Sequence, residues 1–358
     1  MITTGDRGRR GAADESEESL VRREDFLAEY DTLLARWPSP SQDVDLTSEF
    51  GSTRAHVSGP VDAPAVVMFH AYQATSAEWV ELARLLAGER RIYAVDVMGD
   101  AGHSVPGDRA IVTPDDMVAW IDTVLDGLGV ERPELVGHSY GAWIALTYAL
   151  QRPERVGKLT LLDPTMCFAP LLPAYVIRAV PTLLRPTPAR RRSLVRWETR
   201  GTTIDPEWLE LTAAAAKLEG PSRTVPTKVP SAATVATLKP QSLVIVAGAS
   251  RLHHVKRVGS NAAKRIPAGR VETARRTTGY PSPTPNRSRH SCSGNGFCQP
   301  PVFRTVSVPV LRLVTYAFRP LGSTATLVGE SVGISAVTVL VSVSTTETVP
   351  DATFAVYR

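Results

Sequence analysis

The sequence is poor in cysteine and has no long apolar run. Its three cysteines, Cys167, Cys292 and Cys298, form neither a disulfide framework nor the spacing of a metal site, which favours a reducing compartment. No apolar segment opens the chain, and no run reaches the roughly 20 residues that span a bilayer. We therefore expect a cytoplasmic protein without a membrane partner.

Motifs for cofactors and metals are also missing. The sequence has no G-x-x-x-x-G-K-[ST] stretch and no motif for haem, flavin or nucleotide, so we expect no cofactor. His253 and His254 lack a nearby cysteine or acid pair, which argues against a metal site. The net charge of +4 comes with arginines clustered at 185–200 and after 264, without interleaved aromatic residues. This pattern favours a solvated basic face over a nucleic-acid site.

The composition and the apolar patterns are those of one large α/β domain or two ordinary ones. With 43% hydrophobic and 21% charged residues, the 358-residue chain can bury a large core. Short apolar runs predict strands at 44–50, 53–57, 65–70, 91–96, 158–164 and 241–247, and a last strand that begins at 271. Helical spacing occurs at 20–37, 77–87, 114–129 and 252–265. Strands that alternate with helices predict right-handed crossovers and a mostly parallel sheet.

The other segments differ in composition from this core. Residues 1–19 are charged and small, and we expect them to be disordered. Residues 166–236 carry proline-punctuated helical patterns, which predict a helical cap inserted between the core segments 20–165 and 237–273. The tail at 274–358 has no lysine, few acids and β-branched runs that belong to no expected element. We expect this tail to be disordered or to arise from a shifted reading frame.

A G-x-S-x-G sequence joins a predicted strand to a predicted helix. Gly137 and Gly141 bracket Ser139, with a short apolar run before them and an Ala/Leu-rich helical pattern after them. The glycines let strand and helix approach closely while the serine takes a strained backbone position, as in a nucleophile elbow. The pentapeptide alone is a weak signal, because a chain of this length shows one by chance roughly one time in ten. The alternative is a loop serine that happens to lie between glycines.

Four landmarks occur in a set order along the chain. They are the strand end Phe69-His70, the loop Asp96-x-x-Gly99-x-x-Gly102-x-Ser104, the elbow at 137–141, and Leu162-Asp163-Pro164. On these landmarks the chain resembles the α/β-hydrolase family, in its cap-bearing branch, over roughly residues 20–273. The resemblance implies an α/β-hydrolase fold with helices on both faces of a mostly parallel sheet. It also implies a catalytic triad of serine, acid and histidine in that chain order.

The resemblance implies a nucleophile and an oxyanion hole. Ser139 would attack an acyl carbon. The backbone N–H of Tyr140 would stabilise the oxyanion together with an N–H from Ala71 or Tyr72. Most members of the family have His-Gly where this chain has His70-Ala71, which implies a tighter oxyanion loop.

The acid of the triad is assigned to an earlier strand than usual. The family's usual acid position, here 249–251, holds no carboxylate, so the resemblance implies that Asp163 orients the histidine. The alternative is a turn carboxylate before a proline. His138 is expected to point away from the hydroxyl, and His70 and His103 are expected to position loops.

The histidine of the triad is missing from its expected place. The family carries it just beyond the last strand, but 274–281 contains no histidine, and the later His290 lies in a Ser/Arg/Pro-rich run. If 275–281 is written in GC-rich codons and read two bases on, it encodes Ala-His-His-Arg-Leu-Pro, which resembles the family's histidine turn. We therefore hypothesise a reading-frame shift that removes the general base.

The sequence as a whole favours a serine hydrolase that cleaves an ester-like bond of a small molecule through an acyl-enzyme on Ser139. Loss of the triad histidine would weaken its turnover. The alternative is a catalytically inactive α/β-hydrolase shell that binds a ligand or a partner. The sequence leaves the substrate and the oligomeric state open.

Overall fold

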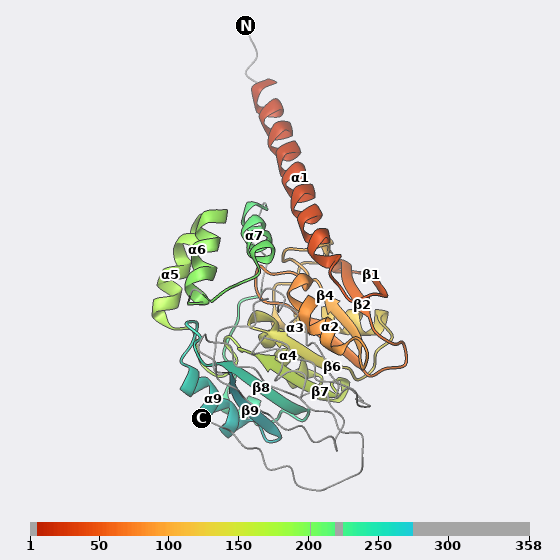
Figure 1. The fold of residues 1–358 in the computed structure, drawn as a ribbon, viewed down its shortest axis with the longest axis vertical. Coiled ribbons are helices and arrows are strands. Elements are labelled where there is room, and N and C mark those ends of the chain that lie inside the picture. The colour runs from red at the N-terminus through yellow and green to blue at the C-terminus, as the bar shows by residue number, and fades with distance from the viewer. Residues whose placement is uncertain (1–5, 201, 219–224, 275–358) are drawn as a thin grey trace, which may run out of the picture.

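A nine-stranded sheet runs through the part of the chain that the computed structural model describes, residues 6–200, 202–218 and 225–274 (Figure 1). The strand order is β1-β2-β4-β3-β6-β7-β8-β9, and β5 pairs with β2. The pairs from β4 through β3 to β9 are parallel, while β2 is antiparallel to β1, β4 and β5. The predicted fold class, a mostly parallel sheet flanked by helices, is confirmed.

The strands are β1 Ser41–Ser48, β2 Gly51–Ser58, β3 Ala65–Phe69, β4 Arg91–Val95, β5 Val105–Pro106, β6 Glu134–His138, β7 Lys158–Leu162, β8 Gln241–Ala247 and β9 Gly269–Ala274. The helices are α1 Asp6–Leu34, α2 Val80–Leu86, α3 Pro114–Gly127, α4 Tyr140–Gln151, α5 Pro173–Leu184, α6 Pro188–Glu198, α7 Pro206–Ala214, α8 Ala232–Val235 and α9 Val255–Arg265. Short 3₁₀ turns are η1 Ser76–Trp79, η2 Pro153–Arg155 and η3 Ala215–Lys217.

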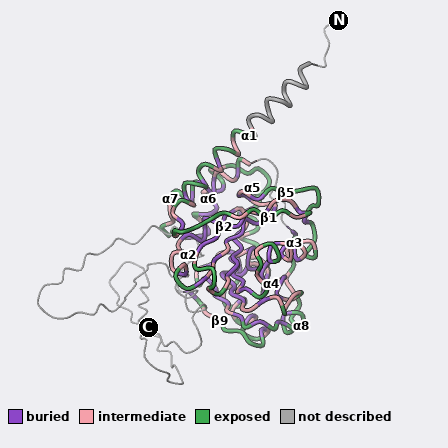
Figure 2. Tube along the Cα trace, turned by 90° about the vertical axis from the view of Figure 1, so that its right-hand side faces the viewer, coloured by how far each residue is buried: buried purple, intermediate pink, exposed green. Residues whose placement is uncertain are grey.

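The central strands bury apolar side chains on both faces of the sheet. In β3, Val67 and Phe69 belong to the cluster that contains α3 and α4, whereas Val66 and Met68 belong to the cluster that contains α2. Successive side chains of a strand point to opposite faces, so a continuous apolar run needs helices on both sides. Figure 2 shows this buried centre, with exposed residues mostly at the periphery.

Three elements differ from the expectation. Residues 6–19, predicted to be disordered, form the first half of α1, and the whole segment before Pro38 lacks a proline that would interrupt a helix. The turn of the first hairpin lies at Glu49-Phe50 rather than at Gly51-Ser52, because Phe50 is buried in the core. The two-residue strand β5 has too short a pattern to be predicted.

The chain between β7 and β8 forms α5 to α8 within the segment predicted to be a cap. In Figure 1, α5, α6 and α7 stand apart from the sheet. The segment contacts the elbow, since Trp143 Nε1 donates to the Lys228 carbonyl and Val225 N donates to the Tyr140 hydroxyl. The tail from residue 275 on, with His290, lies outside the described residues.

Candidate active site

Ser139 lies between β6 and α4 with a strained backbone. Its φ of 52° and ψ of −107° are unusual for a residue with a side chain. A Cβ on Gly137 would lie 2.1 Å from the Gly141 carbonyl oxygen, and one on Gly141 would lie 2.0 Å from that of Phe69. Only glycine therefore fits at either side of the serine. Ser139 itself remains partly exposed, so this turn presents its side chain at the carboxyl end of the sheet.

We expect Gly141→Ala to lower the free energy of unfolding by about 3 kcal/mol or more, because the added methyl group meets backbone that cannot move aside. Gly88→Ala is the matched control, since a Cβ at Gly88 has no neighbour within 4 Å. Urea unfolding of both variants provides the measurement. Equal stability of the two variants would contradict the close strand–helix contact.

Asp163 follows β7 at the same end of the sheet as Ser139. His138 and Leu162 are register partners on neighbouring strands, and the Ser139 N–H donates to the Leu162 carbonyl at 2.9 Å. Asp163 is buried, with 2% of its surface exposed. Its carboxylate accepts hydrogen bonds from the Ala247 N–H at 3.1 Å and from Ser250 Oγ at 2.9 Å. These bonds turn the carboxylate toward the loop that follows β8.

His253 lies against this carboxylate, with its Nε2 3.1 Å from Asp163 Oδ1. That is an ion-pair distance, although neither ring nitrogen makes a well-directed hydrogen bond to any of the described residues. Burial alone would raise the pKa of Asp163, but the contact with His253 and the nearby His138 outweigh it and lower that pKa. The sequence argued against His253 as a metal ligand and did not predict this pairing with Asp163. The only feature of the sequence that pointed to this pairing is a histidine near the position where the family usually carries its acid.

The oxyanion-hole candidates lie on two elements. Tyr140 is the first residue of α4, so its N–H is one of those that a helix leaves without an intrahelical partner. Ala71 donates its N–H to Glu78 Oε2 at 3.0 Å, so in this conformation it points to that carboxylate. Tyr72 lies edge-on to Tyr140, with ring centroids 6.5 Å apart, and its carbonyl accepts a hydrogen bond from Arg191. Because the Ala71 N–H is engaged by Glu78, Tyr72 remains as the candidate of the two alternatives.

Glu78 connects the oxyanion loop to the elbow. Its other carboxylate oxygen, Oε1, pairs with His138 Nδ1, and both side chains are almost fully buried. Burial alone would lower the pKa of His138, but the charge of Glu78 raises it above its ordinary value. His138 thus turns toward Glu78, and the expectation that it points away from the Ser139 hydroxyl stays a prediction. The sequence did not reveal Glu78, because one acid in a predicted helix carries no sign of burial.

The raised pKa of His138 makes stability depend on pH. Its stabilising contribution is complete below about pH 6.5, where histidine in the unfolded chain is protonated, and is lost as pH rises through the higher folded pKa. We expect the free energy of unfolding to decline over that range in urea titrations of the parent chain. The decline should be smaller in His138→Gln. Parallel pH curves for the two proteins would contradict the ion pair.

Comparison with known proteins identifies the fold. A family model described as alpha/beta hydrolase fold matches residues 64–200, which include β3, the elbow and β7. The structure is similar to the crystal structure of carboxylesterase CesB (YbfK) from Bacillus subtilis, with a TM-score of 0.67 and 25% identity over 70% of this chain and 90% of that one. The chain therefore has the α/β-hydrolase fold. The structure of naproxen esterase (carboxylesterase NP) from Bacillus subtilis gives the same TM-score, at 22% identity over 73% of this chain and 92% of that one.

Two relatives in sequence are carboxylesterases of Bacillus subtilis (strain 168). It is 34% identical to carboxylesterase YbfK over 143 residues, which are 40% of this chain and 48% of that protein. It is 33% identical to the uncharacterized carboxylesterase nap over 145 residues, with the same two shares. The chain thus spans about half the length of the curated relatives it matches.

The remaining histidines near the site hold loops, as the sequence predicted. His70 Nε2 accepts the Val97 N–H at 2.9 Å, which ties the end of β3 to the end of β4. His103 Nε2 pairs with Asp31 of α1 at 2.7 Å. Within the described residues, the Ser139 hydroxyl hydrogen-bonds with Thr165 Oγ1 at 2.9 Å, and no histidine bonds to it.

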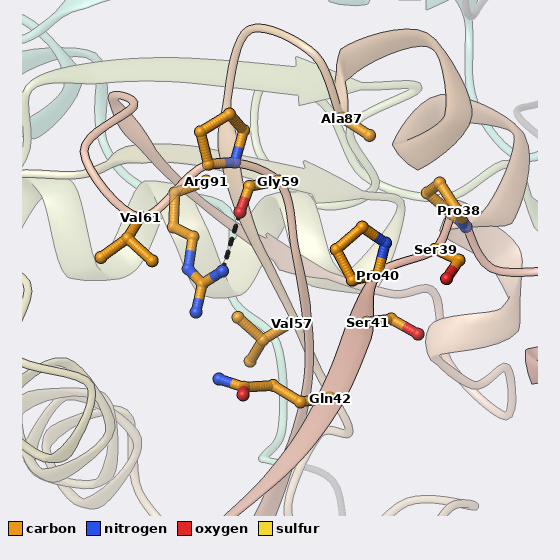
Figure 3. A pocket seen from close by; sticks show the side chains of 11 residues that line it. Pro38, Ser39, Pro40, Ser41, Gln42, Val57, Gly59, Val61, Ala87 and Arg91 are labelled. Carbon is orange, nitrogen blue, oxygen red and sulfur yellow. Dashed lines mark hydrogen bonds between the residues drawn. The ribbon is translucent and has the colours of Figure 1, made fainter.

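The described residues offer neither a metal site nor a membrane-spanning helix. Over these ranges no group of three or more His, Cys, Asp or Glu side chains could hold a metal ion, and no helix is long and apolar enough to cross a bilayer. A surface cavity of about 520 Å³ opens beside Arg91 and Val57 (Figure 3). Arg91 begins β4, so this cavity lies near the amino end of the parallel strands, away from Ser139.

Proposed function

We propose that this chain is a serine hydrolase that cleaves carboxylic esters of small molecules through an acyl-enzyme on Ser139. The observation that carries the proposal is the strained, partly exposed serine at the carboxyl end of the sheet, with Asp163 beside it on the next strand. The names of the carboxylesterase relatives support an ester as the bond that is cleaved.

In the proposed reaction, Ser139 Oγ attacks the ester carbonyl carbon, its proton passes to a base, and the alcohol leaves with a proton. Water then attacks the acyl-enzyme, which releases the carboxylic acid and restores the serine. The N–H groups of Tyr140 and Tyr72 stabilise the negative oxygen of both tetrahedral intermediates. Asp163, whose pKa is lowered, is ionised at neutral pH and is the acid of the site.

We further propose that turnover is slow in this chain. The Ser139 hydroxyl hydrogen-bonds with Thr165 rather than with a histidine of the described residues, and residues 274–281 supply no histidine by sequence. In serine proteases, removal of one triad member leaves roughly 10³–10⁴-fold catalysis over water from the oxyanion hole and binding. We expect residual activity of that kind.

A fluorophosphonate probe tests the proposed nucleophile, and hydrolysis of p-nitrophenyl acetate tests turnover. We expect the probe to label Ser139, as located by peptide mass spectrometry, together with slow release of p-nitrophenol. Absence of labelling under conditions where the chain is folded would refute the acyl-enzyme and favour a binding shell.

Resequencing the gene tests the proposed cause of slow turnover. A shifted frame near Arg275 should appear, and the corrected chain should hydrolyse the ester at least about 100-fold faster, since a general base is then present. An unambiguous read of the present frame would refute the shift.

A further inference from the structure

Helix α5 presents a row of apolar side chains to solvent. Their exposed fractions range from 38% to 77%, and the residues are Val176, Ile177, Val180, Leu183 and Leu184. They account for five of the ten large apolar side chains that the described part of the chain exposes. The opposite side of α5, with Ala179 and Thr182, is buried. A cluster of this kind on one helix marks an interaction surface, whereas single exposed apolar residues do not.

Arginines border this apolar row, and acids are absent from it. From Pro173 to Trp197 the sequence contains six arginines, no lysine, no aspartate and no glutamate. Arg191 is buried and Arg192 pairs with Glu210, which leaves four exposed arginines, Arg178, Arg185, Arg190 and Arg196. Figure 1 shows α5 as the outermost helix of its group, with α6 between it and α7. The apolar row and the arginines thus lie on the outside of the molecule.

We propose that α5 and its neighbouring arginines dock on the surface of an anionic phospholipid bilayer. An amphipathic helix of this kind lies in the plane of the membrane interface, with its apolar side chains inserted at the boundary between headgroups and acyl chains. Basic residues at its edge bind the lipid phosphates, at about 1 kcal/mol for each residue near the surface. With 12 residues, α5 is too short to span a bilayer. The absence of a long apolar run predicted that the chain has no membrane partner. Contact with the surface of a membrane needs no such run.

Charge favours an anionic bilayer over a second copy of the chain as the partner of this surface. Two copies that joined through α5 would bring two sets of arginines together with no acid in the same segment to compensate them. A bilayer that contains anionic lipid provides the opposite charge over the whole surface. The proposal does not depend on the chemistry of Ser139, so the two can fail separately.

Co-sedimentation of the full chain with vesicles tests the proposal. We expect binding to vesicles of phosphatidylcholine mixed with phosphatidylglycerol, weaker binding to phosphatidylcholine alone, and a loss of binding as salt screens the charges. The double variant Ile177→Ser/Leu184→Ser should bind about tenfold more weakly or worse, because two apolar side chains no longer insert. Its matched control is Val61→Ser/Val112→Ser, which removes two exposed valines elsewhere on the surface and should bind like the parent chain.

The arginines are tested in the same assay. Arg178→Gln/Arg185→Gln should weaken binding to the anionic vesicles about tenfold while binding to phosphatidylcholine alone stays the same. Arg132→Gln, an exposed arginine distant in sequence, is the control. Absence of binding to anionic vesicles at low salt would overturn the proposal, and so would equal losses in the controls. A dimer in analytical ultracentrifugation that Leu184→Ser dissociates, without vesicle binding, would assign the face to self-association instead.

Discussion

Ser139→Ala should abolish labelling by a fluorophosphonate probe and remove the part of p-nitrophenyl ester hydrolysis that passes through an acyl-enzyme, which leaves only the catalysis that the oxyanion hole and binding supply. The reason is that the variant removes the only atom that can form the acyl-enzyme while leaving its strained backbone turn intact. Both losses should occur without a loss of stability, because the substitution deletes one oxygen from a partly exposed side chain.

Ser260→Ala is the matched control for this experiment. Ser260 is exposed on α9, so its replacement should change neither labelling nor turnover. Labelling that persists in Ser139→Ala would show that the probe reacts elsewhere. Turnover that stays at the rate of the parent chain would show that an acyl-enzyme on Ser139 does not contribute to it, and either result removes the basis of the proposed mechanism.

Glu78→Gln should destabilise the fold by about 3 kcal/mol, because it leaves the buried His138 without its counter-charge. His138→Gln should lower the free energy of unfolding by a similar amount, because it leaves the buried Glu78 carboxylate without its counter-charge. The double variant should cost clearly less than the sum of the two, since neither charge then remains buried alone. Urea unfolding of the four proteins at pH 6 measures this coupling.

Glu78→Gln should also slow catalysis. Glu78 accepts the Ala71 N–H, so a change in its charge loosens the loop that carries the proposed oxyanion donor of Tyr72. We expect kcat to fall with little change in KM. Glu81→Gln is the control, because Glu81 pairs with Arg84 of its own helix α2 rather than with the loop at Ala71. In the urea unfolding of the four proteins, a loss of stability in the double variant equal to the sum of the two single losses would contradict the buried ion pair.

The positions of the strands were largely predictable because apolar periodicity is a local property. The strand 241–247 has the predicted bounds, and the helix expected at 114–129 runs from Pro114 to Gly127. The errors arose where a tertiary contact overrode the local pattern. Phe50, for example, is buried, and this moves the first hairpin turn to Glu49-Phe50.

The candidate site, like the fold, was predicted only in part from the sequence. The sequence identified Ser139 and its glycines, because the need for a missing Cβ at 137 and 141 is visible in the residue types themselves. It also put Ser139 and Asp163 at one end of the sheet, since both follow parallel strands. Their roles in catalysis remain predictions.

The sequence by itself determined the order of strands and helices and the strained turn at Ser139, because periodicity and small residues act over a few neighbours. Only the tertiary structure decided which buried charges pair. Glu78 meets His138 across 60 residues, and Asp163 meets His253 of the segment that follows β8. Such pairs depend on how whole elements pack, and a buried acid or histidine has no local pattern that reveals its partner.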